Sequence, residues 1–145
     1  KLRTKFRTLT VISGFPTALY NIEDAINAFQ NLAGDQAGLC VFIYGPGELR
    51  ANLYDLAARF DNIEIFDGYQ ECYFNTFLKN ADLFLRLTDV DSVGISVWDA
   101  FFWKVKIVAT DVCKRPDTAY LVRSGVDEHE LRDVVQEALS RSNVS

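Results

Sequence analysis

The chain has 145 residues, of which 49% are hydrophobic and 24% charged, and its formal net charge is −5 at pH 7. This length and apolar content suffice for one domain with a buried core, and they exclude an intrinsically disordered chain. No apolar run approaches the roughly 20 residues of a membrane-spanning helix, and the start lacks a signal-peptide pattern. We therefore expect a cytoplasmic protein, with peripheral attachment to the inner face of the plasma membrane as a second option.

The charge is unevenly distributed. The first seven residues include four bases, and the rest of the chain carries −9, from 11 Lys and Arg against 20 Asp and Glu. An acidic body argues against nucleic-acid binding. We interpret residues 1–7 as a linker or as the lead-in to the first strand, although alternating bases also suit a phosphate or membrane surface. Because the chain starts at Lys1 and contains no Met, we expect a fragment of a longer protein.

The three cysteines, Cys40, Cys72 and Cys113, contain no C-x-x-C pair and are odd in number. This pattern favours reduced cytoplasmic thiols over a disulfide framework or a zinc site.

Strand-like and helix-like segments alternate along the chain. Apolar runs of strand length lie at 8–13, 39–44, 62–66, 81–87 and 105–110. Helical spacing of apolar residues is found at 21–32, 48–59, 73–80, from 94 onward, and at 128–140. Asn21 is the predicted N-cap of the first helix, because Glu23 and Asp24 follow it with charges that suit a helix start.

Strands this apolar, each followed by a helix, predict an α/β domain whose parallel sheet is covered on both faces. We expect a doubly wound, Rossmann-like sheet of about six strands in a single domain, 1–145. Such sheets bind ligands at the carboxyl ends of their strands, near a topological switch point. The loops expected on that edge follow Ser13, Tyr44, Phe66, Leu87 and Thr110.

The segment 86–117 carries the strongest candidate site. Its helix begins with unpaired backbone N–H groups, which suit a phosphate or diphosphate, at Gly94, Ile95 and Ser96. Asp91 and Asp99 flank this turn, and two carboxylates there can hold the hydroxyls of a ribose or a sugar. The alternative is a loop acid and a first-turn acid that only stabilise the helix dipole.

Further motifs surround this segment. They are a first strand ending at Gly14, the turn Gly45-Pro46-Gly47, the strand end Phe66-Asp67-Gly68, the strand start Ala81-Asp82, the paired acids with seven residues between them, and Thr110-Asp111 followed by Pro116-Asp117. In this order, across essentially all of the chain, they resemble the C-terminal, donor-binding half of GT-B retaining glycosyltransferases of the group 1 type. That family transfers sugars, including hexoses, from nucleotide donors to polysaccharides and lipids.

The resemblance implies a set of roles. The backbone of Gly94, Ile95 and Ser96 would hold the donor diphosphate, with Gly14 and Gly68 also at the donor site. Asp99 would bind the ribose, and Asp91 would face the transferred sugar. No metal and no covalent cofactor is implied. The acceptor, a glycan or a lipid-linked molecule of bacterial capsule, lipopolysaccharide or exopolysaccharide synthesis, would bind an N-terminal lobe absent from this chain, so the isolated half should be inactive.

The chain departs from the usual family pattern in its charges. The Arg and Lys that commonly follow the first-strand glycine read here as Phe15 and Tyr20, and both acids are Asp where Glu is usual. Arg86 and Arg115 resemble a variant pattern of polysaccharide-synthesising members, and they would supply the missing positive charge from neighbouring loops. For Arg86, a surface salt bridge is the alternative.

Two other functions stay open. A degenerate relative would bind nucleotide sugars weakly or serve as an interaction module. An unrelated Rossmann-like nucleotide binder or oxidoreductase is disfavoured, because no G-x-G-x-x-G follows the first strand. An aromatic run on the acid-bearing helix is expected to lie mostly in the core, with contact to the absent lobe as the alternative, and comprises Trp98, Phe101, Phe102 and Trp103.

Overall fold

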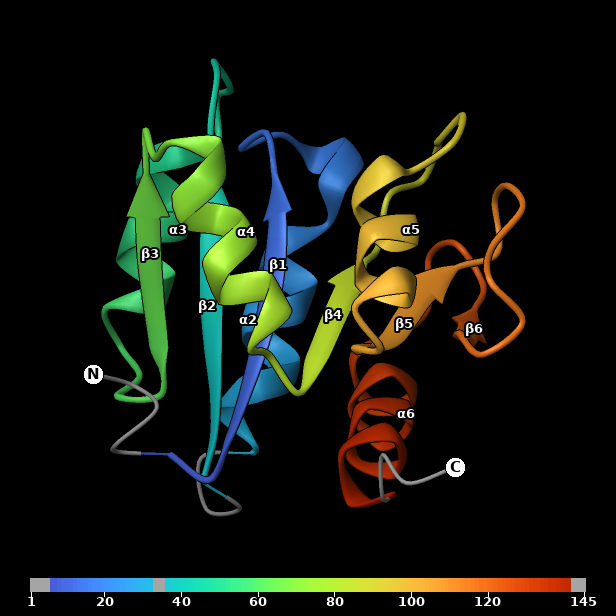
Figure 1. Ribbon diagram of the computed structural model, residues 1–145. Coiled ribbons are helices and arrows are strands. Elements are labelled where there is room, and N and C mark those ends of the chain that lie inside the picture. The colour runs from blue at the N-terminus through green and yellow to red at the C-terminus, as the bar shows by residue number, and fades with distance from the viewer. Residues whose placement is uncertain (1–5, 33–35, 142–145) are drawn as a thin grey trace.

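The computed structural model describes residues 6–32 and 36–141, which form a six-stranded parallel sheet with helices on both faces (Figure 1). The strands are β1 (Thr8–Gly14), β2 (Ala37–Ile43), β3 (Ile63–Asp67), β4 (Leu83–Arg86), β5 (Lys106–Thr110) and β6 (Tyr120–Val122). The helices are η1 (Ala18–Tyr20), α2 (Ile22–Gln30), α3 (Arg50–Ala57), α4 (Glu71–Lys79), α5 (Ile95–Phe102) and α6 (Glu128–Ser140). The predicted α/β, doubly wound architecture is confirmed.

The strand order places a topological switch point in the middle of the sheet. The order is β3-β2-β1-β4-β5-β6, and every neighbouring pair is parallel. The chain moves outward from β1 to β3, and α4 then carries it back to β4 on the other side of β1. The loops that follow β1 and β4 therefore diverge at one edge, where sheets of this kind bind their ligands.

Side-chain alternation along the strands divides the core into two layers. Ile12, Val41 and Leu85 point to the layer that α2, α3 and α6 cover. Val11 and Phe84 point to the opposite layer, covered by α4 and α5 (Figure 1). Every residue of β2 is buried, as expected for a strand with a neighbour on each side and helices on both faces.

Two polar side chains, the half-buried Asp82 and the buried Asn62, fix the edge of the sheet where the strands begin. Asp82, from the Ala-Asp strand start, accepts the backbone N–H of Leu9 at 2.7 Å and so ties the entry of β4 to β1. The fully buried Asn62 donates from Nδ2 to the carbonyls of Phe29 at 2.8 Å and Ala37 at 3.0 Å. The conspicuous Asp82 thus has a structural role at the edge opposite the ligand-binding edge.

Asn21 is the N-cap residue of α2, as predicted, but its side chain does not cap the helix. Its backbone is left-handed, with φ of 53°, and its side chain makes no capping hydrogen bond. Nδ2 instead donates to the carbonyl of Leu87 at 2.7 Å and to Oδ1 of Asp89 at 2.8 Å. The side chain therefore joins the loop after β1 to the loop after β4, a long-range role that local sequence does not show.

The aromatic run on α5 also differs from expectation. Phe102 is 74% exposed and Phe101 is 37% exposed, while Trp98 and Trp103 are only partly covered. The buried residues of α5 are the smaller Val97 and Ala100. In so short a helix, the sheet contacts one narrow stripe, and Phe101 and Phe102 lie outside it, whereas Trp103 packs against the edge of the core.

Some elements differ in their bounds from those that the sequence predicts. The sixth strand, β6, was not located individually, and α3 begins two residues later than expected. The three cysteines are free thiols, Cys40 in the core and Cys72 at the surface. Of the segment 1–7, residues 1–5 lie outside the described residues, and Arg7 donates its backbone N–H to Gln36. Among the described helices, none has the length and apolar character that crossing a membrane requires.

Candidate functional site

The end of β1 is closed by aromatic side chains. A Cβ on Gly14 would lie 2.2 Å from the Tyr20 ring, so only glycine permits this ring to lie against the strand. Phe15 stacks on Tyr20 with ring centroids 5.8 Å apart, and it meets Tyr44 edge-on at 4.8 Å. The rings of Phe15 and Tyr20 are half-buried, at the two positions where most members of the family that the sequence resembles have cations. Tyr20 covers Gly14, which was predicted to lie at the donor site.

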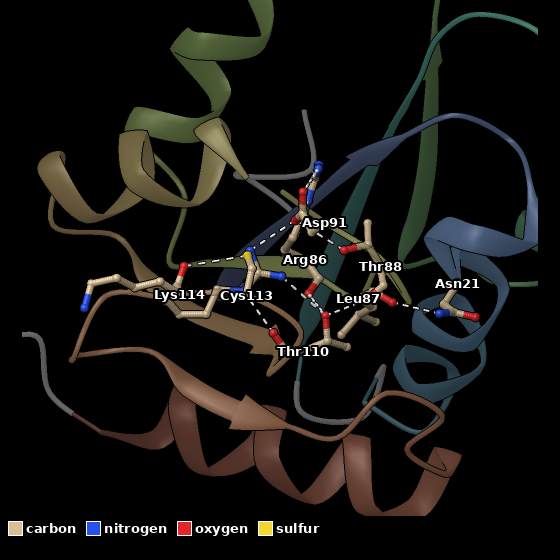
Figure 2. A network of polar contacts seen from close by, with 9 residues as sticks. Asn21, Arg86, Leu87, Thr88, Asp91, Thr110, Cys113 and Lys114 are labelled. Carbon is tan, nitrogen blue, oxygen red and sulfur yellow. Dashed lines mark hydrogen bonds and ion pairs between the residues drawn. The ribbon is translucent and has the colours of Figure 1, made fainter. Parts of the chain in front are cut away.

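The positive charge lies instead at the end of β4. Arg86 donates from Nε to Oδ2 of Asp91 at 3.0 Å and from Nη2 to Oδ1 at 3.2 Å, a two-point ion pair (Figure 2). Its guanidinium also lies over the Tyr20 ring, 5.6 Å from the centroid. The side chain of Arg86 is 14% exposed. It is therefore a partly buried salt bridge rather than the surface pair considered as its alternative.

A second arginine reaches the same carboxylate from the loop that follows β5. Arg115 donates from Nη1 to Oδ2 of Asp91 at 3.1 Å and from Nε to the carbonyl of Thr110 at 2.9 Å. Thr110 in turn donates to the carbonyl of Thr88 at 2.7 Å, and the Thr88 hydroxyl lies 3.3 Å from Oδ2 of Asp91 (Figure 2). The Arg115 side chain is only 1% exposed, so it is a buried arginine whose charge is balanced inside the protein.

The pKa of Asp91 reflects these neighbours. Burial on its own would raise it, but the hydrogen bonds and positive charges of Arg86 and Arg115 outweigh burial and hold the pKa of this carboxyl below its ordinary value. Asp91 is therefore ionised at neutral pH. With two arginines and one carboxylate, the cluster retains one unbalanced positive charge.

Gly94 places the start of α5 against this cluster. Its φ is +69°, and a Cβ there would lie 2.6 Å from Nη1 of Arg115 and 3.0 Å from Oδ2 of Asp91. Both the backbone angle and the contact require glycine. The N–H groups of the first helical turn, including those of Ile95 and Ser96, have no acceptor within the helix and so add to the positive potential.

A hollow of about 380 Å³ opens beside this turn. Its walls come from the carboxyl ends of β1, β2 and β3 and from the facing sides of α4 and α5, and the lining residues are Ser13, Tyr44, Tyr69, Glu71, Phe74, Asn75, Ile95, Ser96 and Asp99. Burial is the largest cause of the raised pKa of both Tyr44 and Tyr69, so both tyrosines stay neutral at physiological pH. The hollow is thus walled by aromatic rings on one side and by polar groups of α5 on the other.

The structure gathers most of the predicted site residues into two adjoining groups. Arg86, Asp91, Gly94 and Arg115 form the charged cluster, whereas Ile95, Ser96 and Asp99 line the hollow. Gly68 belongs to neither. It is exposed, its φ is +68°, and no heavy atom lies within 4 Å of the Cβ that it lacks.

Sequence reasoning missed the aromatic walls of the hollow and the part that Thr110 plays in the charged cluster. Tyr44 directly follows β2, and Tyr69 follows the glycine that ends β3. A large side chain just past the carboxyl end of a parallel strand is a usable signal, because all such positions meet at one edge.

Comparison with known proteins supports the fold. No protein-family model matches the chain, and no curated protein matches it. Among solved structures, it is similar to the C-terminal domain of a glycosyl transferase group 1 family protein (LpcC) from Francisella tularensis. The TM-score is 0.77 at 17% sequence identity, over 94% of this chain and 77% of the other. The chain therefore shares the Rossmann-like, doubly wound α/β fold of that domain, the fold that the sequence predicted.

Proposed function

We propose that this chain is the donor-binding half of a nucleotide-sugar-dependent glycosyltransferase. The observation that carries the proposal is the hollow at the switch point, where Asp99 and the start of α5 adjoin an excess positive charge. A nucleoside diphosphate has the matching chemistry, with ribose hydroxyls for a carboxylate and a diphosphate for backbone N–H groups and a guanidinium.

In this proposal, Asp99 accepts hydrogen bonds from the ribose, and the backbone of Gly94, Ile95 and Ser96 holds the diphosphate. Arg86 adds the positive charge that stabilises the leaving diphosphate, as the bond between the diphosphate and the anomeric carbon of the sugar breaks and the acceptor oxygen bonds to that carbon. Within the described residues, its Nη1 makes no hydrogen bond, so this part of the guanidinium is free for an anion. The proposal extends to the whole reaction. The sugar is transferred with retention of its anomeric configuration to a bacterial glycan or lipid-linked acceptor, which another lobe binds.

One observation favours a second candidate, a degenerate lobe that binds nucleotides weakly or acts as an interaction module. Phe15 and Tyr20 stack where charged residues were expected, and their rings cover the end of β1. A domain with this change retains the fold while losing part of its charge for a diphosphate. Nucleotide affinity separates the two candidates.

The test is calorimetric titration of the chain with UDP, GDP, ADP and CMP, repeated with Asp99→Ala. We expect one nucleotide to bind, and Asp99→Ala to weaken it by roughly 1–3 kcal/mol because a hydrogen-bonded carboxylate is lost. Asp55→Ala, on the exposed side of α3, is the matched control and should change nothing. If none of the four nucleotides binds, the result favours the degenerate lobe. An unchanged affinity in Asp99→Ala would refute the assignment of Asp99.

A further inference from the structure

We propose that Asp91 is a positioning residue, which with the buried Arg115 holds Arg86 toward the donor diphosphate and does not itself contact the transferred sugar. This inference rests on the proposed function above. It departs from the role that the family resemblance implies for Asp91, and it comes from the contacts of the charged cluster.

The carboxylate of Asp91 has little capacity left for a sugar. Four hydrogen bonds reach its two oxygens, two from Arg86, one from Arg115 and one from Thr88. Its side chain is only 7% exposed. Three of these hydrogen bonds converge on Oδ2, so a sugar hydroxyl could approach only Oδ1. There it would compete with an arginine hydrogen bond in which donor and acceptor are both charged, whereas in its own bond only the carboxylate would be charged.

The three charged side chains differ in how far they reach the surface. Arg115 is the most deeply buried and is anchored at both ends of its guanidinium, by Thr110 and by Asp91. Arg86 is the most exposed of the three and keeps Nη1 without a hydrogen bond in the described part of the chain. The chain of contacts therefore runs outward, from Arg115 through Asp91 to Arg86.

Arg86 is restrained on a second side as well. Its guanidinium edge is fixed by Asp91, and its face lies over Tyr20. Burial raises the pKa of Tyr44, which lines the hollow, and the positive charge of the Arg86 guanidinium offsets part of this rise. A flexible side chain held at edge and face loses little further entropy when it binds an anion, so the restraint contributes to affinity.

The test is a double-mutant cycle between Asp91→Asn and Arg86→Gln, measured by titration with uridine, UDP and UDP-glucose, or with the adenine or guanine set if that base binds. The affinity ratio of diphosphate to nucleoside gives the phosphate increment, and the ratio of nucleotide sugar to diphosphate gives the sugar increment. Removing the charge of Asp91 also changes the electrostatic potential at the phosphate directly. This direct effect is present whether or not Arg86 has been replaced. The coupling between the two substitutions isolates the part that passes through Arg86.

We expect the effects of the two substitutions on the phosphate increment to depart from additivity by about fivefold or more. The sugar increment should stay within about twofold of its original value in every variant. Asp55→Asn, which replaces an exposed acid on α3, is the control and should leave both increments unchanged. A tenfold loss of the sugar increment in Asp91→Asn, with or without Arg86, would overturn the inference, and so would strictly additive phosphate increments. Absence of nucleotide binding by the unaltered chain would instead refute the proposed function, and the inference with it.

Discussion

Replacing Gly94 by alanine tests how rigidly the charged cluster is held. The left-handed backbone at this position costs a residue with a Cβ about 1–2 kcal/mol. The new Cβ would also lie 2.6 Å from Nη1 of Arg115, and this side chain is 1% exposed and bonded at several points, so it cannot swing aside freely. Loosening its contact with Asp91 costs roughly 1–3 kcal/mol more, because two buried charges lose part of their pairing.

The expected destabilisation by Gly94→Ala is therefore about 2–5 kcal/mol, a large share of the stability of a typical domain. Gly68→Ala is the matched control. Its φ of +68° is almost the same, but no heavy atom lies within 4 Å of the added Cβ, so only the backbone cost of about 1–2 kcal/mol applies. Urea unfolding followed by tryptophan fluorescence measures both. Equal losses in the two variants would refute the reasoning, since the contact with Arg115 would then cost nothing.

Two further predictions concern stability. The pKa of Asp91 is lowered in the folded state, so its contribution is present above the ordinary carboxyl pKa and is lost as pH falls below about 4. Asp91→Asn should flatten this part of the acid-unfolding profile, and an unchanged profile would contradict the ion-pair geometry. Asn62→Ala should cost about 2–4 kcal/mol in urea unfolding, because the buried carbonyls of Phe29 and Ala37 both lose their donor. A loss below 1 kcal/mol would show that water replaces the amide there.

The sequence predicted the architecture because local rules and global fold agree in the middle of the sheet. Five apolar runs separated by helical periods leave few options other than a parallel sheet covered on both faces. The shortest strand, β6, was not predicted, because its three residues are too few to show a period. The surroundings of Asn21 escaped for another reason, because its partners Leu87 and Asp89 are more than 60 residues away.

In the candidate site, too, the local features could be predicted from the sequence and the long-range contacts could not. The spacing of Asp91 and Asp99 and the turn at Gly94 are local, and the sequence shows them. The pairing of β4 with β5, which sets Arg86 beside Ala109, is what brings Arg115 to the carboxylate of Asp91 from 24 residues away. The rings of Tyr44 and Tyr69, which wall the hollow, likewise follow separate strands, β2 and β3.

The sequence by itself therefore determined the fold class and the residues that carry charge at the edge of the sheet where we expect a ligand. Only the tertiary structure decided which charges neutralise one another and which stays available. The physical reason is that periodicity and turn chemistry act over a few residues, whereas burial and ion pairing depend on which strand ends lie side by side. Asp91 and Asp99 look equivalent in the chain, yet one is bound by two arginines and the other lines an open hollow.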